Sequence, residues 1–240
     1  MWDAETRESL WCCCDVLFDH MAACFSDRPS LCMILQVKGE SESDVTAFVL
    51  AGGKSSRMGS DKAFLRLGEE TLLSQALKIA GAVTRQVRIV GNASKFAAFG
   101  QVVEDLYRDR GPLGGIHAAL SSSVTELNLM LAVDLPFVGL KFLKYLLMRA
   151  RESGAIVTVP RAGSGLQPLC AIYRRGFLEA AEESLREGKN RIDSLFTKDV
   201  AFVIEESELA RAGFSVEMFR NLNTPEEFEM ARAVRSPMRN

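Results

Sequence analysis

A short apolar run that ends in a glycine-rich, basic loop is the feature that most limits the fold of this chain. The run Val45–Leu50 is β-prone and bounded by turn formers, which predicts a buried strand. Gly52 and Gly53 follow it, and because glycine has no Cβ, their amides can approach and face an anion. Arg57 and Lys62 add cationic side chains further along. The junction therefore predicts a strand followed by a loop that can bind a chain of phosphates.

Two widespread phosphate-binding motifs are excluded by the details of this loop. A P-loop has the pattern GxxxxGK[ST], but Ser60 stands where its lysine should be, and no Ser or Thr follows Lys62. A dinucleotide-binding fold needs GxGxxG leading into a helix, which the letters AGGKSSRMG do not supply. A glycine-rich turn with solvated charges remains as the plainer alternative.

Composition favours small-molecule chemistry in a single domain. The chain has 240 residues, of which 48% are hydrophobic, enough for one sizeable core. Its net charge is −2 with a pI near 5.9, and no block of Lys and Arg occurs, so a nucleic-acid surface is not indicated. No apolar stretch reaches the ~18 residues needed to cross a bilayer, so we expect a soluble protein with no membrane partner.

The cysteines separate the beginning of the chain from the rest. All but one of the 6 cysteines lie within the first 32 residues, and only Cys170 lies beyond them. Their spacing gives no CxxC pair, so free, reduced thiols in a cytoplasmic protein are the simpler interpretation. An irregular zinc site made of Cys14, His20 and Cys24 is the alternative.

This asymmetry predicts a domain boundary. We expect residues 1–44 to be a poorly ordered extension and linker, and residues 45–236 to form the main domain. An equally open interpretation is that the chain starts too early and that Met33 opens the true product.

Beyond the loop, strand-like and helix-like segments alternate. This alternation predicts an α/β fold, a three-layer α/β/α sandwich with a Rossmann-like, mostly parallel sheet. The expected strands after the first are Gln86–Val90, a short one before Asp105, Leu127–Val133, Ala155–Val159, Leu169–Tyr173 and Val200–Ile204; the expected helices are Thr71–Val83, Leu140–Ala150, Phe177–Arg186 and Pro225–Val234.

Polar residues follow the ends of the first four expected strands. Gly52 follows the first, Asn92 the second, Asp105 the third and Asp134 the fourth. Ligands of open parallel sheets bind at the carboxyl ends of strands, so these residues are expected to converge. A carboxylate such as Asp134, directly after an apolar strand, suits a hard cation that bridges phosphate oxygens, whereas an N-cap for the helix at Leu140 is the structural alternative.

Four segments in order resemble one family, the molybdenum cofactor guanylyltransferases (the MobA family of nucleotidyltransferases). The first, from Leu50 to Lys62, is similar to the family's LAGGxSxRMGxDK signature. The others are Glu104-Asp105 with Gly111-Pro112-Leu113-Gly114-Gly115-Ile116, then Asp134-Leu135-Pro136-Phe137, then Asn221-Leu222-Asn223-Thr224-Pro225-Glu226. The resemblance covers residues 46 to 235 and implies the fold of nucleotide-diphospho-sugar transferases.

The resemblance implies an activity. Such an enzyme transfers GMP from GTP to molybdenum-molybdopterin with Mg²⁺, forms molybdopterin guanine dinucleotide and releases pyrophosphate. It would have transient contacts with cofactor-biosynthesis proteins and apo-molybdoenzymes. A cytidylyltransferase acting on the same pterin, which shows LAAG at the loop, and a catalytically silent nucleotide-binding partner that delivers cofactor are the alternatives.

The resemblance also implies roles for individual residues. The GTP-binding set would be Leu50, Ala51, Gly52, Gly53, Lys62, Asn92, Asp105 and Asp134. Lys62 and Arg57 would act as catalytic cations on the phosphates, with Asp134 as the magnesium ligand and third catalytic residue. Asn221 and Asn223 would line the pterin side.

Several other residues carry weaker expectations. His117 is expected to be packed or hydrogen-bonded rather than catalytic. Gly114 stands where the family usually has alanine, a change expected to be harmless. Met130 and Phe137 are expected in the core. Arg174 and Arg175 either face the acidic cofactor or form a solvated pair.

Overall fold

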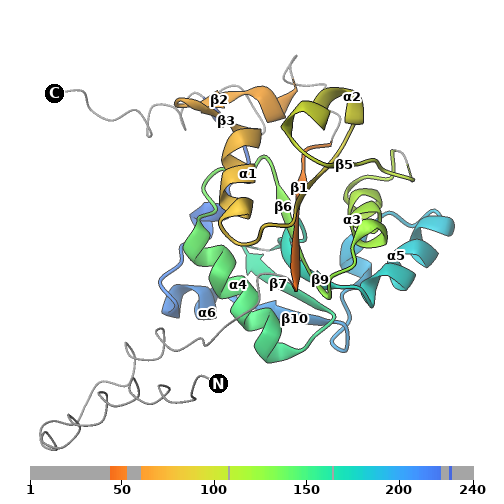
Figure 1. Cartoon of the computed structure of the whole chain (residues 1–240). Helices are drawn as coiled ribbons and strands as arrows, with labels where there is room; N and C mark the ends of the chain where they lie inside the picture. The colour runs from red at the N-terminus through yellow and green to blue at the C-terminus, as the bar shows by residue number, and fades with distance from the viewer. Residues whose placement is uncertain (1–43, 53–60, 108, 164, 223–226, 229–240) are drawn as a thin grey trace, which may run out of the picture. The chain divides into compact units, whose positions relative to one another are not determined.

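A computed structural model describes residues 44–52, 61–107, 109–163, 165–222 and 227–228 (Figure 1). Contacts divide the chain into the units Met1–Glu40 and Ser41–Asn240, and all described residues belong to the second. The N-terminal cysteines and Met33 lie outside the described residues, as does nearly all of the helix expected over Pro225–Val234.

The centre of the second unit is a mostly parallel sheet, as predicted. Its strands run in the order β10-β7-β9-β6-β1-β4-β5, and β8 pairs with β7 at one side. Only β9 and β8 run antiparallel to their neighbours. The bounds are β1 Val45–Leu50, β4 Val87–Val90, β5 Val102–Val103, β6 Leu127–Ala132, β7 Val157–Ala162, β8 Gly165–Leu166, β9 Cys170–Arg174 and β10 Ala201–Ile204, with a separate hairpin of β2 Arg66–Leu67 and β3 Glu70–Thr71.

Helices cover both faces of the sheet, which confirms the three-layer α/β/α sandwich (Figure 1). The α-helices are α1 Leu72–Gly81, α2 Ala93–Phe96, α3 Pro112–Ser122, α4 Leu140–Ser153, α5 Phe177–Arg186 and α6 Glu206–Arg211. The 3₁₀ turns are η1 Lys62–Phe64, η2 Ala97–Phe99, η3 Ile192–Leu195 and η4 Val216–Phe219.

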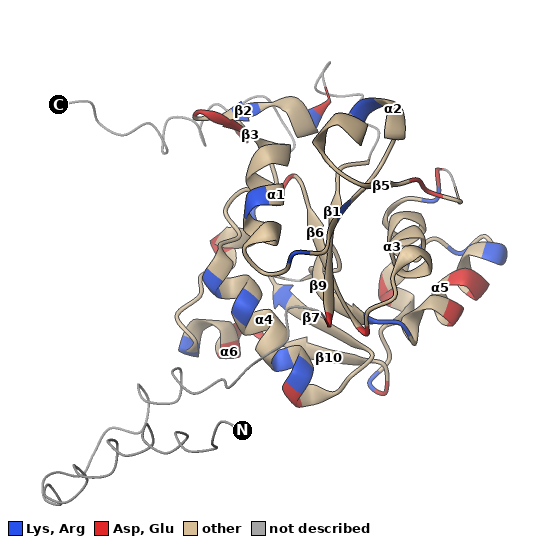
Figure 2. Cartoon of the chain, in the orientation of Figure 1, with Lys and Arg blue, Asp and Glu red and all other residues tan. Residues whose placement is uncertain are grey.

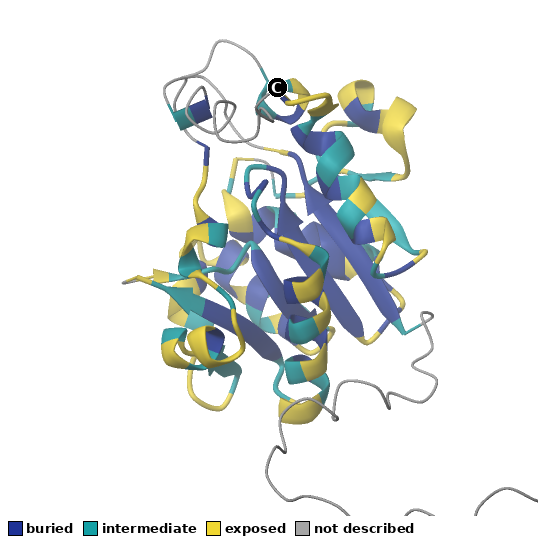
Figure 3. Ribbon diagram, turned by 90° about the vertical axis from the view of Figure 1, so that its left-hand side faces the viewer, coloured by how far each residue is buried: buried dark blue, intermediate teal, exposed yellow. Residues whose placement is uncertain are grey.

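Alternation along the strands divides the core in two. In β1, Ala47 and Val49 face the cluster that includes α1 and α4, while Phe48 and Leu50 face the cluster that includes α3 and α5. A strand that is apolar on both faces is what a doubly covered parallel sheet requires. Figure 3 shows these strands as a buried centre with exposed residues on the outer sides of the helices. Charged residues likewise lie mostly on helices and loops (Figure 2).

The structure corrects several element bounds. The helix expected over Leu140–Ala150 continues to Ser153, because it ends only where Gly154 takes a left-handed conformation (φ 64°). The strand expected at Ala155–Val159 begins at Val157 and extends to Ala162. Helix α5 has the expected bounds. Helix α3 was not among the expected elements, because its small residues give a weak helical pattern.

The strand order creates a switch point. From β1 the chain adds β4 and then β5 on one side, and then places β6 on the other side of β1. At such a point the connections leave in opposite directions, which opens a crevice outside the carboxyl ends of the strands. The ends of β1 and β6 are held in register, with Leu50 opposite Ala132. Ala51–Gly52 and Val133–Asp134 therefore leave the sheet side by side.

Within the described ranges, no helix combines the length and the apolar character needed to pass through a lipid bilayer.

Candidate active site

Lys62 and Asp134 meet at the switch point. Lys62 opens η1, and its Nζ lies 3.6 Å from Oδ2 of Asp134, which follows β6. The side chains are 18% and 25% exposed, so each is largely covered but can still be reached from solvent. The two structural alternatives are therefore excluded. Lys62 is not a solvated charge on a glycine-rich turn, and Asp134 is not the N-cap of the following helix, because Gly139 occupies that position. The sequence prediction that the early loop and the distant carboxylate converge is confirmed for this pair.

The end of β1 lies beside Lys62 and Asp134. Ala51 is buried, while Gly52 is exposed, and the amides of both point at the carbonyl of Val90 on β4, at 3.0 and 3.2 Å. A Cβ on Gly52 would lie 3.7 Å from Gly91 Cα, so the described fold alone does not require glycine here. The expectation that the amide of Gly52 faces an anion is wrong, because that amide donates to the carbonyl of Val90. Gly53 and Arg57 lie outside the described residues.

The turn that carries Asp134 is held by two distant parts of the chain, helix α1 and residues 220–222. The carbonyl of Asp134 accepts a hydrogen bond from the amide of Leu222 at 3.3 Å. Gln75 on α1 donates to the carbonyl of Pro136 at 3.0 Å, and Arg220 lies over the ring of Phe137 at 4.9 Å. These contacts were not foreseen, because no local sequence signal indicates that segments so far apart meet. They hold the backbone of the turn and bring exposed Asn221 close to it; Asn223 lies outside the described residues.

Asn92 and Asp105 lie along the same edge of the sheet. Asn92 follows β4 and caps α2, its Oδ1 accepting hydrogen bonds from the amide and hydroxyl of Ser94 at 2.8 and 2.6 Å. Asp105 follows β5, and its Oδ1 accepts from the amide of Tyr107 at 2.9 Å. Burial raises the pKa of Asp105 above its ordinary value, partly offset by that hydrogen bond. Both residues stand where the prediction put them, on the β4 and β5 side of the crevice.

Gly114 has a role that the sequence did not indicate. A Cβ at this position on α3 would lie 2.7 Å from Oδ2 of Asp105 and 2.9 Å from the carbonyl oxygen of Tyr107. The segment after β5 therefore packs more closely on the helix than an alanine would allow.

His117, one turn further along α3, is packed, as expected. Its side chain is buried, and its ring meets that of Tyr107 edge-on at 5.0 Å. Among the residues that the structure describes, its Nδ1 has no hydrogen-bond partner. Burial lowers its pKa below the ordinary value, although Glu182 and Asp105 act in the opposite sense.

The arginine pair does not belong to the site. Arg174 lies opposite Leu127 in the sheet, at the edge away from Asp134, and donates to Glu126 and to the carbonyls of Ala155 and Ala150. Both earlier interpretations of Arg174 are wrong, because the antiparallel direction of β9 brings it to the opposite edge in a network of its own. Exposed Arg175 follows it there.

The remaining core expectations are met in different degrees. Met130 is fully buried in β6, whereas Phe137 is only partly buried and packs at the margin of the core.

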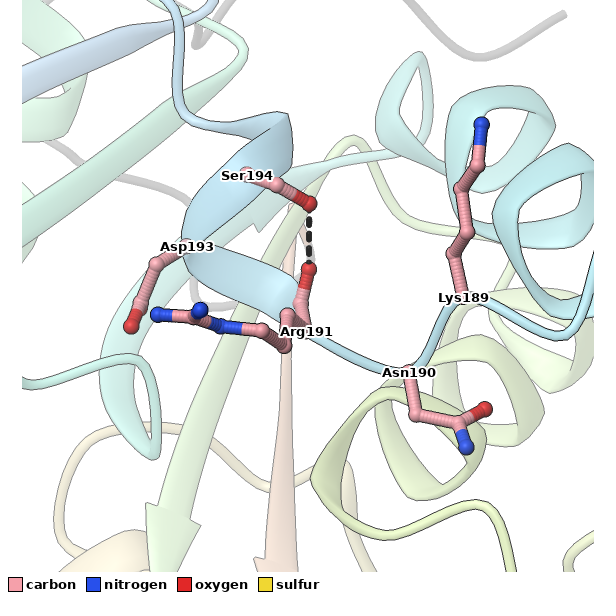
Figure 4. A pocket seen from close by; sticks show the side chains of 5 residues that line it. All are labelled: Lys189, Asn190, Arg191, Asp193 and Ser194. Atoms are coloured by element: carbon pink, nitrogen blue, oxygen red, sulfur yellow. Dashed lines mark hydrogen bonds between the residues drawn. The ribbon is translucent and has the colours of Figure 1, made fainter.

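A hollow of about 490 Å³ lies where α5 leads into η3, outside the predicted residues (Figure 4). Its lining residues are Lys189, Asn190, Arg191, Asp193 and Ser194. Ser194 Oγ donates to the carbonyl of Arg191 at 2.7 Å, which closes the turn. The basic turn after Gly188 is the sequence signal that could have indicated this hollow.

Comparison with known proteins assigns the chain to a family. The MobA-like NTP transferase domain matches residues 47–202. A probable molybdenum cofactor guanylyltransferase of Pelotomaculum thermopropionicum is 38% identical over 79% of this chain and 92% of its own length. The molybdenum cofactor guanylyltransferase of Syntrophotalea carbinolica is 33% identical over 78% and 90%.

A solved structure agrees on the fold. The molybdopterin-guanine dinucleotide biosynthesis protein A of Archaeoglobus fulgidus superposes with a TM-score of 0.70 at 24% identity, over 79% of this chain and 97% of that one. The chain therefore belongs to the MobA-like NTP transferase family and is a nucleotidyltransferase.

Proposed function

We propose that this protein transfers GMP from GTP to molybdenum-molybdopterin, forming molybdopterin guanine dinucleotide and releasing pyrophosphate. The names of the relatives described above support the two substrates. The structural observation that carries the proposal is the approach of Lys62 and Asp134 to 3.6 Å at the switch point of the sheet. A cation and a carboxylate held together there suit a triphosphate and its counter-ion.

The reaction needs charge neutralisation more than covalent catalysis. An oxygen of the pterin's terminal phosphate attacks the α-phosphorus of GTP, and pyrophosphate leaves, so two anions must be brought together in line. We assign the backbone of Leu50, Ala51, Gly52 and Gly53 to contact with the nucleotide and the Lys62 ammonium to its phosphates. Arg57 serves as the second cation, which stabilises the departing pyrophosphate.

Asp134 is the residue that would hold Mg²⁺. The described residues contain no cluster of three or more metal-binding side chains, so they offer no cage made by the protein alone. This fits magnesium, which commonly takes one or two carboxylates and completes its shell with substrate phosphates and water. When bound, the ion would offset the charge that develops on the phosphates. Asp134 would orient it, since its turn is fixed by Leu222, Gln75 and Arg220.

We assign Asn92 and Asp105 to guanosine. The Watson–Crick edge of guanine presents N–H donors, and an ionised carboxylate is an acceptor only, so the two are complementary. The close packing of Asp105 on Gly114 would fix the direction of that acceptor. On the other side of Asp134, Asn221 and Asn223 would face the pterin, with Asn221 held near by the Leu222 hydrogen bond.

The substrates of the proposed reaction indicate where the protein works and which proteins it contacts. We propose that residues 45–236 form the nucleotidyltransferase domain and that the protein works in the cytoplasm. It would contact cofactor-biosynthesis proteins and apo-molybdoenzymes transiently, since the product must be passed on.

A pyrophosphate-release assay tests the function. The full chain is incubated with molybdenum-loaded molybdopterin and either GTP or CTP, with and without Mg²⁺. We expect release with GTP that depends on both the pterin and the metal. Release with CTP alone would replace the assignment by a cytidylyltransferase. Binding of GTP without any release would indicate a silent carrier instead of an enzyme.

A further inference from the structure

The turn that presents Lys62 is held by a residue outside the predicted site. Asp61 caps η1, because its Oδ1 accepts a hydrogen bond from the amide of Ala63 at 3.3 Å. The other oxygen, Oδ2, lies 2.8 Å from Nζ of Lys95 on α2. The Asp61 side chain is 21% exposed and that of Lys95 53%. A lysine from a neighbouring helix therefore fixes the carboxylate that begins the turn.

The other end of η1 rests on the same part of the chain. The ring of Phe64 lies 5.6 Å from that of Phe96 and 5.7 Å from that of Phe99, centroid to centroid. Phe96 is buried over Gly91, where a Cβ would lie 2.8 Å from the ring. Residues 93–99 thus hold η1 by an ion pair at its start and by aromatic packing at its end.

The same helix begins at a residue that we assign to the nucleoside. Asn92 is the N-cap of α2, and the amide of Ala93 donates to Oε1 of Glu104 at 2.9 Å, one residue before Asp105. Helix α2 therefore lies between the proposed guanosine residues and the lysine proposed for the phosphates.

Folding stability does not account for the ion pair with Asp61. Partly exposed ion pairs contribute little to stability, because water competes for both charges and the long side chain loses freedom. The position of Lys62 is a different matter, since a shift of about 1 Å in a group that contacts the reacting atoms can lower a rate about a hundredfold. We therefore expect the ion pair between Lys95 and Asp61 to affect the position of Lys62 more than the stability of the fold.

We propose that Lys95 is a positioning residue for nucleotidyl transfer: by holding Asp61 it sets where the Lys62 ammonium lies relative to Asp134 and the donor phosphates. The inference rests on the proposed function for its effect on rate, but not for its effect on the position of Lys62. Lys95 acts through Asp61 and has no role of its own at the reacting atoms.

The kinetic test removes the charge and keeps the stem of the side chain. In Lys95→Met we expect kcat with GTP and loaded molybdopterin to fall about tenfold, while KM for GTP changes less than about twofold. Lys95→Arg should recover most of the loss. Asp61→Asn should show a similar loss, and the double variant Asp61→Asn/Lys95→Met should be no slower than the slower single variant. Additive losses in the double variant would overturn the proposed route through Asp61.

A matched control is available in the same protein. Lys78 on α1 pairs with Glu70 on β3 at 2.9 Å, with side chains 71% and 45% exposed. Lys78→Met removes an ion pair of nearly the same length and should leave kcat unchanged. Equal rates in Lys78→Met and Lys95→Met would overturn the proposal.

A second measurement does not depend on turnover. Reductive methylation with ¹³C-formaldehyde gives each lysine an NMR signal, and the Lys62 signal is identified by its loss in Lys62→Arg. It should shift in Lys95→Met and not in Lys78→Met. An unmoved signal would reject the positioning role even in an active enzyme. A shifted signal in a protein that releases no pyrophosphate from GTP would reject the proposed function and keep the positioning role.

Discussion

The two ends of strands β1 and β6 use polar residues in opposite ways. At the amino ends, Thr125 donates to the hydroxyl of Thr46 at 2.8 Å, and Asn128 donates to the carbonyls of Thr125, Glu126 and Tyr173, each at 3.2 Å. Thr46, Thr125 and Asn128 are all buried, and each has a hydrogen-bond partner inside the fold. At the carboxyl ends, Lys62 and Asp134 face each other at 3.6 Å, longer than a hydrogen bond, and remain partly exposed.

This difference distinguishes polar groups that stabilise the fold from polar groups that can bind a ligand. A polar group that is buried must find its partner within the protein, so a closed network stabilises the fold and has no capacity left for a ligand. Charged side chains that stay partly exposed can be reached by a substrate. Four substitutions test this division, and they are ordered by the size of the expected effect.

The largest effect is expected at the carboxyl ends. Lys62→Ala and Asp134→Ala should each lower the rate of pyrophosphate release about a hundredfold or more, since removing a preorganised charge from a transition state costs ~3 kcal/mol. Thermal unfolding should change little in both variants, because a partly exposed ion pair contributes ~0–1 kcal/mol. Near-wild-type turnover would remove the substituted residue from the proposed role.

At the amino ends the expected effect is on stability. Asn128→Leu removes the buried amide that donates to the carbonyls of Thr125, Glu126 and Tyr173, and it should reduce the free energy of unfolding by ~1–3 kcal/mol, measured by urea denaturation. The rate per folded molecule should stay unchanged. Asn190→Leu is a suitable control, because Asn190 is exposed and its replacement should cost almost nothing. A stable Asn128→Leu with a slow reaction would contradict the division between the two ends.

The smallest effect is expected at His117, which is buried yet lacks a partner for Nδ1 within the described residues. Burial holds its pKa below the ordinary value of 6.5, so the folded protein keeps it neutral where an unfolded chain takes up a proton. The unfolded state then binds more protons, and stability should fall as the pH drops below about 6.5.

A His117→Gln variant should lose that part of the pH dependence. Melting temperatures of both proteins between about pH 5 and 8 would measure it. Parallel curves for the variant and the wild type would show that the pKa of His117 is the same in the folded and the unfolded chain.

The sequence predicted the elements whose pattern is set locally. Strands β1 and β6 are apolar runs interrupted only by Thr46 and Asn128, and helix α5 shows a clear helical pattern, so their bounds were nearly right. The direction of β9 was not predicted, because an apolar run looks the same in a parallel and an antiparallel strand. That single reversal is why Arg174 was misplaced.

The sequence could predict a residue of the candidate site where the same motif also contains the strand end and the turn that position it. Lys62 and Asp134 each follow a strand and a turn signal, so the topology of the sheet brings them together. The supports were not predictable: Lys95, Gln75 and Leu222 act from other elements, and their contacts depend on packing that no local pattern records. Gly114 shows the same limit, since its importance lies in a distance to Asp105.

The hydrogen bond from Leu222 to Asp134 has a consequence for how the protein is made. The turn that carries the proposed magnesium ligand is completed by a segment near the end of the chain. A ribosome must therefore synthesise residues 220–222 before this turn can take its final form, and a product cut short ahead of Arg220 would lack the support that these residues give it.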